Sequence, residues 1–265
     1  PVLLEFNTPQ FLRSIFPDTI SIYAYGILIG LGVVISFIYC LPRVKKFGVE
    51  RRQLESLFLN TILVAFIGGK IFYYLQDPSR YIASPGKMLD NLGSGFVFYG
   101  SLLFAVPYII YWLKRNNFPV KSFLDILAFV GPILHGFGRL GCLMAGCCYG
   151  KACSNFLGIV YSDPLSKARP LNTSLYPTQL FDIGVNLLII LILILIKRKQ
   201  AFEGQLFLTY IILYAIGRSI VEIFRGDAER GFFFNFISHS QAIALCLVLF
   251  TGIIWKRWRA SEISN

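Results

Sequence analysis

Apolar stretches of about 20 residues recur along the chain, and each is long enough to cross a bilayer as a helix. Hydrophobic residues make up 55% of the sequence and charged residues 15%, whereas a soluble domain carries about 25% charged residues. The pattern therefore predicts an all-α, polytopic membrane protein with about seven transmembrane helices and a single integral membrane domain over residues 1–265. The predicted spans are 22–42, 56–76, 94–113, 123–145, 178–196, 204–224 and 240–256.

Basic residues are distributed unevenly between the two sides of this topology. The connections after the first, third, fifth and seventh spans are the richer in Lys and Arg, so they are predicted to be cytoplasmic, with the N-terminus extracytoplasmic. Residues 155–177, a small predicted cap, and 225–240 are then extracytoplasmic loops. The net charge of +11 indicates contact with anionic membrane lipids, because no basic face on a soluble module suggests a nucleic-acid partner. The cytoplasmic basic residues are Arg43, Lys45, Lys46, Arg51, Arg52, Lys114, Arg115, Lys121, Lys197, Arg198, Lys199, Lys256, Arg257 and Arg259.

One predicted span carries a histidine and an arginine inside an apolar, glycine-rich run. His135 and Arg139 are four residues apart within 133–153, ILHGFGRLGCLMAGCCYGKAC, and would share one face of a helix. A charged side chain at mid-bilayer costs roughly 3 kcal/mol or more, so it marks a functional site by default. The alternative is an arginine that reaches the interface or is paired for structure alone.

Three further charged residues fall in later spans. Asp182, Arg218 and Glu222 are predicted to lie in the outer half of the bilayer, at the depth of Arg139. Two arginines facing a lipid-accessible interior suit an anionic headgroup, since guanidinium binds phosphate in a planar, bidentate way and stays charged when desolvated. For Arg218 and Glu222, at i and i+4, a purely structural ion pair is the alternative.

Four of the six cysteines fall between Cys142 and Cys153, with the spacing C-x4-C-C-x4-C. This is not a familiar zinc pattern. A disulfide from Cys147 or Cys148 to Cys153 is one interpretation, since the outer face is often oxidising. Packing of small apolar residues is the other, and a thiol or acyl carrier is the least favoured.

Six segments, in order along nearly the whole chain, resemble the motifs of the bacterial prolipoprotein diacylglyceryl transferases. The segment HGFGRLGCLMAGCCYGK is similar to that family's signature, in which the arginine corresponds to Arg139. The other five are YAYGILIGLG, GGKIFYYL, GSGFVFYGSLL, YPTQLFD and YAIGRSIVEIFRGD.

The resemblance implies a reaction at the bacterial cytoplasmic (inner) membrane. A diacylglyceryl group would pass from phosphatidylglycerol to the thiol of the lipobox cysteine in a preprolipoprotein signal peptide, forming a thioether and releasing glycerol phosphate. It implies no metal and no cofactor.

The matching motif positions imply which residues carry the reaction. Arginines would neutralise the phosphodiester and the charge that grows as its C–O bond breaks. The implied catalytic residues are Arg139, Arg218, Tyr99, His135, Tyr25 and Tyr214, and the implied substrate-binding residues are Arg139, Gly150, Gln179, Glu222 and Arg225.

The chain departs from the family's pattern at several motif positions. The histidine often proposed as the family's base is Tyr99 here, the histidine of another motif is Tyr176, and the asparagines and glutamate of the signature are Cys142, Ala145 and Cys147. His135, one turn before Arg139, could act as the base, since its ordinary pKa is near neutrality; the alternative, which we prefer, needs no side-chain base and uses Tyr99 for positioning.

These departures keep two other functions open. One is a non-catalytic lipid-binding or transport membrane protein of the same fold, although no internal repeat typical of transporters is evident. The other is a related transferase with a different acceptor.

The charge asymmetry predicts a cytoplasmic C-terminus. A reporter that is active only outside the cytoplasm, fused after Asn265, should therefore be inactive. An active fusion would contradict this topology.

Overall fold

The computed structural model describes residues 2–7, 19–90, 95–225, 232–233 and 237–263. The chain divides into two compact units. Unit 1 comprises residues 1–38 and 124–265, and unit 2 comprises residues 39–123.

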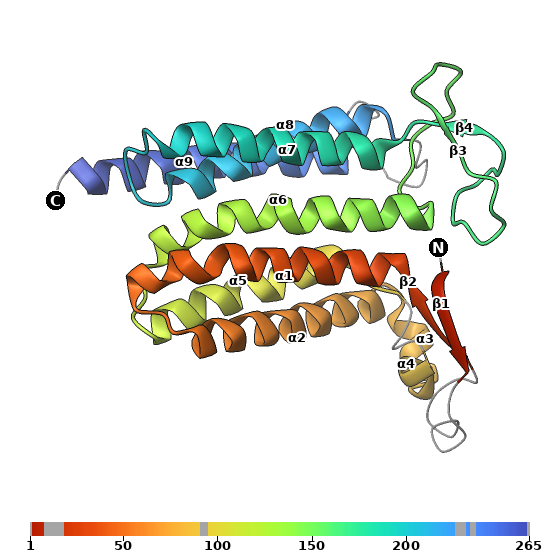
Figure 1. The fold of residues 1–265 in the computed structure, drawn as a ribbon, viewed down its shortest axis with the longest axis horizontal. Helices are drawn as coiled ribbons and strands as arrows, with labels where there is room; N and C mark the ends of the chain where they lie inside the picture. The colour runs from red at the N-terminus through yellow and green to blue at the C-terminus, as the bar shows by residue number, and fades with distance from the viewer. Residues whose placement is uncertain (1, 8–18, 91–94, 226–231, 234–236, 264–265) are drawn as a thin grey trace. The chain divides into compact units, whose positions relative to one another are not determined.

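Within the described residues, a long helix lies at each of the seven predicted spans (Figure 1). Five of the helical segments are long and apolar enough to cross a membrane, those of α1 with the 3-10 turn that follows it, α2, α6, α7 and α8. This confirms the predicted all-α polytopic membrane class, while α5 and α9 as membrane spans stay predictions. The seven helices are α1 (Ala24–Val44), α2 (Arg51–Leu75), α5 (Phe98–Arg115), α6 (Val120–Ala145), α7 (Thr178–Lys197), α8 (Gln205–Ile223) and α9 (His239–Ile263).

The shorter elements are a 3-10 turn, two short helices and three antiparallel strand pairs. The predicted cap at 155–177 contains one pair, β3 with β4, beyond the end of α6 and the start of α7 (Figure 1). Most of the predicted loop 225–240 lies outside the described residues. The elements are η2 (Lys45–Phe47), α3 (Pro78–Ala83), α4 (Gly86–Asp90), β1 (Val2–Asn7) with β2 (Thr19–Tyr23), β3 (Ile159–Val160) with β4 (Ser174–Leu175), and β5 (Phe232–Phe233) with β6 (Ile237–Ser238).

Helix α7 is polar on its buried side and apolar on its exposed side. Asp182 and Asn186 are buried, whereas Leu187 and Leu191 are 62% and 53% exposed. In water an exposed apolar face of this kind would promote aggregation, but in a bilayer it contacts lipid tails. The polar residues are thus kept inside the protein, where functional groups of membrane proteins usually lie.

Close helix packing in unit 1 depends on glycines. A Cβ on Gly32 of α1 would lie 2.8 Å from the Cβ of Phe137 in α6, and one on Gly217 of α8 would lie 2.3 Å from a methyl carbon of Val185 in α7. Small residues of this kind let membrane helices approach closely and gain van der Waals contact.

Helix α8 begins with a cap supplied by another helix. The buried carboxylate of Asp125, in α6, accepts backbone N–H bonds from Gly204 at 2.7 Å and from Phe207 at 3.1 Å. It also accepts a 2.6 Å bond from the side-chain amide of Gln200. The cap satisfies backbone donors that a helix start leaves unpaired, and it ties α8 to α6.

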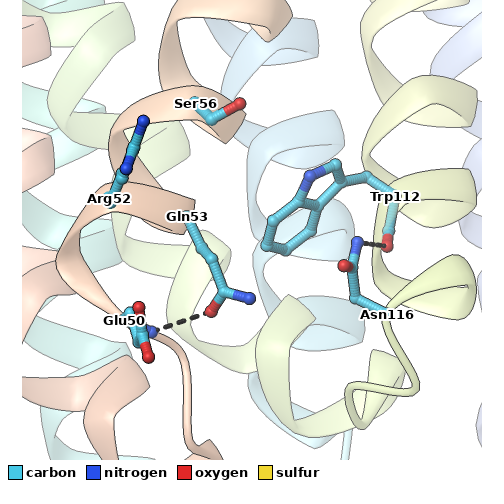
Figure 2. Close-up of a pocket in the computed structure, with 6 residues that line it drawn as sticks. All are labelled: Glu50, Arg52, Gln53, Ser56, Trp112 and Asn116. Atoms are coloured by element: carbon cyan, nitrogen blue, oxygen red, sulfur yellow. Dashed lines mark hydrogen bonds between the residues drawn. The ribbon is translucent and has the colours of Figure 1, made fainter.

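In unit 2, α2 and α5 pack through a pair of glycines. A Cβ on Gly68 would lie 2.6 Å from the carbonyl oxygen of Gly100, and the reverse distance is 2.5 Å. A polar hollow of about 320 Å³ lies where α2 begins and α5 ends. Figure 2 shows Gln53 accepting a 2.9 Å bond from the backbone N–H of Glu50, beside Trp112. None of the residues predicted to form the functional site lines this hollow.

Two glycines of α1 provide a matched test of this packing. Gly32→Ala should lower stability by roughly 1–3 kcal/mol, as overpacking does, because its Cβ would meet Phe137. Gly30→Ala, whose Cβ would meet nothing within 4 Å, should be neutral or slightly stabilising. Thermal unfolding of both variants in detergent measures the difference, and equal midpoints would contradict the packing described.

Candidate active site

The core of the candidate site is an arginine of α6 held by an acid of α7. The Nε of Arg139 lies 2.9 Å from Oδ2 of Asp182, and the two side chains are 16% and 3% exposed. The same Nε donates to Nε2 of His135 at 3.0 Å. The predicted common depth of Arg139 and Asp182 is therefore confirmed, and the charge of the arginine has a buried counterion.

The ring of His135 lies between Arg139 and Asn186. Its Nε2 accepts from Arg139, so a neutral ring must carry its proton on Nδ1. Nδ1 lies 3.3 Å from Oδ1 and 3.0 Å from Nδ2 of Asn186, and of these two atoms only Oδ1 can accept its proton. The Nδ2 of Asn186 donates to the backbone carbonyl of Asp182 at 2.6 Å. Both ring nitrogens are thus engaged, and the ring holds Arg139 and α7 together.

The terminal nitrogens of Arg139 are left for another partner. Among the described residues, none accepts a hydrogen bond from its Nη1 or Nη2. With Nε anchored and both Nη groups without an acceptor in this part of the chain, the guanidinium presents a planar fork of the kind that binds phosphate.

Helices α8 and α1 supply aromatic groups near this arginine. The Tyr214 ring stands edge-on to His135 with centroids 5.5 Å apart. Tyr25 of α1 lies against α6, because a Cβ on Gly141 would meet Tyr25 Cδ2 at 2.8 Å. One turn after Tyr214, Arg218 forms the predicted ion pair with Glu222, at 2.5 Å between Nη2 and Oε2.

Helix α6 ends in a Schellman motif. The N–H of Gly146, whose φ is +70°, donates to the carbonyl of Leu143, and the N–H of Cys147 donates to that of Cys142. This pattern favours glycine at the left-handed position and brings the residue after it back onto the last helical turn. Cys148, with φ of +61°, turns the chain again.

The start of α7 clamps the loop that follows α6. The hydroxyl of Thr178 donates to the carbonyl of Cys148 at 2.6 Å, and the amide of Gln179 donates to the carbonyl of Cys147 at 2.7 Å. Both side chains are fully buried. Gln179 also donates to the Tyr161 hydroxyl at 3.3 Å; burial raises the pKa of Tyr161, and this bond opposes the rise.

Gly150 lies where three segments meet. Its N–H donates to the carbonyl of Tyr176 at 2.8 Å, and it pairs with Arg225 in an isolated antiparallel bridge. A Cβ there would lie 2.4 Å from the carbonyl oxygen of Phe224 and 2.8 Å from Thr178. Only glycine fits this crossing, so the geometry gives Gly150 a structural role.

The structure does not contain the disulfide to Cys153, which was one of two interpretations of the cysteine spacing. All six cysteines are free thiols, and the Sγ of Cys153 lies 3.7 Å from the hydroxyl of Ser174. Cys147 and Cys148 instead turn back toward Cys142, because the Schellman motif reverses the chain; the three sulfurs lie within 4.8 Å of one another. Hydrogen bonds from the other two thiols lower the pKa of Cys148, and the charges of Arg139 and Arg225 act in the same direction.

Seven of the predicted residues fall into three groups, apart from Tyr25 and the ion pair of Arg218 with Glu222 described above. His135 contacts both Arg139 and the ring of Tyr214. Gly150, Gln179 and Arg225 build the loop between α6 and α7, and Arg225 is buried there. Tyr99 belongs to unit 2 and is 58% exposed, and its predicted role stays a prediction.

Two buried residues of α7, Thr178 and Asn186, were not among the residues predicted from the sequence. Both lie four residues from Asp182, so all three share the buried face of the helix. Polar residues repeated at this spacing in an apolar run were the signal that could have found them.

Fold and site together define a polytopic membrane protein that keeps an arginine fork, suited to an anionic group, among its helices. The family model for prolipoprotein diacylglyceryl transferase matches residues 12–257. The chain belongs to this family.

Curated relatives agree over most of the chain. A phosphatidylglycerol–prolipoprotein diacylglyceryl transferase of Clostridium tetani is 33% identical over 230 residues, which is 87% of this chain and 90% of the relative. A second, of Clostridium perfringens, is 32% identical over 89% of this chain and 90% of the relative. One from Rickettsia bellii is 27% identical over 92% of each.

The pairing of Arg139 with Asp182 predicts a non-additive double mutant. Asp182→Ala leaves a buried arginine without its counterion and should destabilise the protein by about 3–5 kcal/mol. Adding Arg139→Ala removes the stranded charge, so the double variant should be more stable than Asp182→Ala alone. Thermal unfolding of the two single variants and the double variant measures the coupling, and additive losses would contradict the pair.

Proposed function

We propose that this protein transfers the diacylglyceryl group of phosphatidylglycerol to the lipobox cysteine of preprolipoprotein signal peptides, forming a thioether at the bacterial inner membrane. Family membership and the activity for which the curated relatives are named support this. The five helical segments apolar enough to span a membrane suit an enzyme whose donor is a lipid.

The observation that carries the proposal is the orientation of Arg139. Its Nε is fixed by Asp182 and His135, and its two Nη groups have no partner among the described residues. A phosphodiester has two unesterified oxygens that such a fork can hold side by side. Asp182 keeps the guanidinium in place before the lipid arrives, so little reorganisation is needed.

The transfer itself breaks one bond and forms another. The sulfur of the lipobox cysteine attacks the glyceryl carbon that carries the phosphate, a C–S bond forms, and the C–O bond to the phosphate breaks. The thiol loses its proton to water, and glycerol phosphate leaves with one more negative charge than the diester had. Arg139 holds that phosphate more tightly as the charge develops, which is where an arginine lowers the barrier. Arg218 adds a positive charge near the site, because it interacts electrostatically with His135.

The remaining site residues act by position in this scheme. His135 keeps Arg139 oriented, because its basic Nε2 is occupied by that arginine. Tyr214 supports the His135 ring, and Tyr25, 43% exposed beside α6, lies at the edge of the site. Glu222 pairs with Arg218. Gly150, Gln179 and Arg225 keep the loop after α6 in place, and the positioning role of Tyr99 stays a prediction from the resemblance.

Arg139 can be tested by substitution. The assay is mass spectrometry of a lipobox peptide incubated with the purified protein and phosphatidylglycerol, which detects a thioether-linked diacylglyceryl adduct. Arg139→Ala should lower turnover by at least about 10²–10³-fold, the loss typical of a removed charge-stabilising group. Arg139→Lys keeps the charge but loses the bidentate fork, so it should lower turnover more than lipid binding.

Arg51→Ala is the matched control, because among the described residues that arginine pairs with Glu55 alone and its side chain is 71% exposed; it should transfer like the parent protein. Near-parental transfer by Arg139→Ala would overturn its assigned role. Lipid binding without any adduct in the parent protein would favour a binding or transport function.

A further inference from the structure

We propose that the thiols of Cys142, Cys147 and Cys148 form a three-coordinate site for a soft monovalent metal ion, and that the ion bound there is Cu(I). The sequence analysis expected no metal here, because the spacing C-x4-C-C-x4-C matches no familiar zinc pattern. Three of those four cysteines nevertheless converge, with all their sulfurs within 4.8 Å of one another.

The convergence results from the backbone. Cys142 is the last-turn residue whose carbonyl accepts the N–H of Cys147, and side chains at these two positions of a Schellman motif normally touch. The left-handed φ of Cys148 then places its thiol beside the other two. Three sulfurs bound to one ion at about 2.3 Å lie about 4 Å apart, so small side-chain rotations complete the site.

Ligand number and type select the ion. Among the described residues, no further His, Cys, Asp or Glu joins this group. A structural zinc site is almost always four-coordinate, whereas thiolates alone suit Cu(I) as a soft ion. The site also lacks the carboxylates that harder cations need.

The surroundings hold the thiols in place and balance their charge. Thr178 and Gln179, both fully buried, bind the carbonyls of Cys148 and Cys147, so the loop is fixed without a metal. Three thiolates and one Cu(I) carry a net charge of −2. The positive charges of Arg225 near Cys148 and of Lys167 near Cys147 offset that charge, whereas the charge of Arg139 is already balanced by Asp182.

A second consequence rests on the proposed function. Arg139, whose charge interacts with Cys148 of this cluster, is also the residue proposed to bind the lipid phosphate. An anionic Cu(I)–trithiolate centre would compete with the phosphate for the same guanidinium. Cu(I) binding should therefore inhibit the transferase, and the cluster would make lipoprotein modification sensitive to copper.

Metal binding is tested directly, without an activity assay. The detergent-purified full chain is titrated with Cu(I) under anaerobic, reducing conditions against a chromophoric Cu(I) chelator. The parent protein should retain one Cu(I) per chain, with three sulfurs in its X-ray absorption spectrum. We expect a lower Cu(I) affinity in each of three single variants, Cys142→Ser, Cys147→Ser and Cys148→Ser. Loss of an outer-shell partner lowers metal affinity by about 10- to 100-fold, and loss of a direct ligand should lower it further.

Cys153→Ser is the matched control, because its thiol lies near Ser174 rather than in the cluster. It should bind Cu(I) like the parent protein. Failure of the parent protein to hold Cu(I) against the chelator, or an equal loss in Cys153→Ser, would overturn the site. Three separate variants, each checked by thermal unfolding, guard against one that fails to fold.

Inhibition is tested with the lipobox peptide assay. Cu(I) at one equivalent should inhibit the parent protein and leave Cys147→Ser active, and the same peptide in both reactions controls for copper bound by the substrate thiol. Equal inhibition of both proteins would overturn the regulatory consequence. No transfer by the parent protein even without copper would instead contradict the proposed function and leave the measured metal binding unchanged.

Discussion

The ion pair between Arg139 and Asp182 is the interaction on which the candidate site depends. A lone arginine among lipid-facing helices costs several kcal/mol, and the buried carboxylate 2.9 Å away offsets much of that cost. Because Asp182 and His135 both bind Nε, the pair also decides which nitrogens remain for a ligand. Stability and binding geometry therefore come from the same contact, and it links α6 to α7.

The loop after α6 is the second element that the site requires, and it is built from backbone hydrogen bonds. Gly146 ends the helix, Gly150 lets three segments cross, and the buried Thr178 and Gln179 bind the loop's carbonyls. This arrangement brings three thiols together close to Arg139. At the signature positions where the resemblance implies asparagine and glutamate, the chain has Cys142 and Cys147, so the same backbone presents a different chemistry.

Much of the fold followed from hydropathy, because a bilayer leaves few alternatives to apolar helices of about 20 residues. All seven predicted spans coincide with long helices in the described residues. The cysteines show where the sequence was insufficient. Spacing alone left a disulfide to Cys153 and simple packing open, since neither the reversal at Gly146 nor the position of Ser174 beside Cys153 is visible in a linear pattern.

The sequence by itself determined the membrane class and the positions of the helices. It showed which charged residues lie in apolar spans, where their cost indicates a functional role. It also identified Arg139, because a charge in an apolar run is rare for a physical reason. Only the tertiary structure decided the partners: that Asn186 contacts His135, that the Nε of Arg139 donates to His135 beside its counterion Asp182, and that three thiols converge. Such contacts join helices more than 40 residues apart along the chain, and local periodicity carries no information about distances between them.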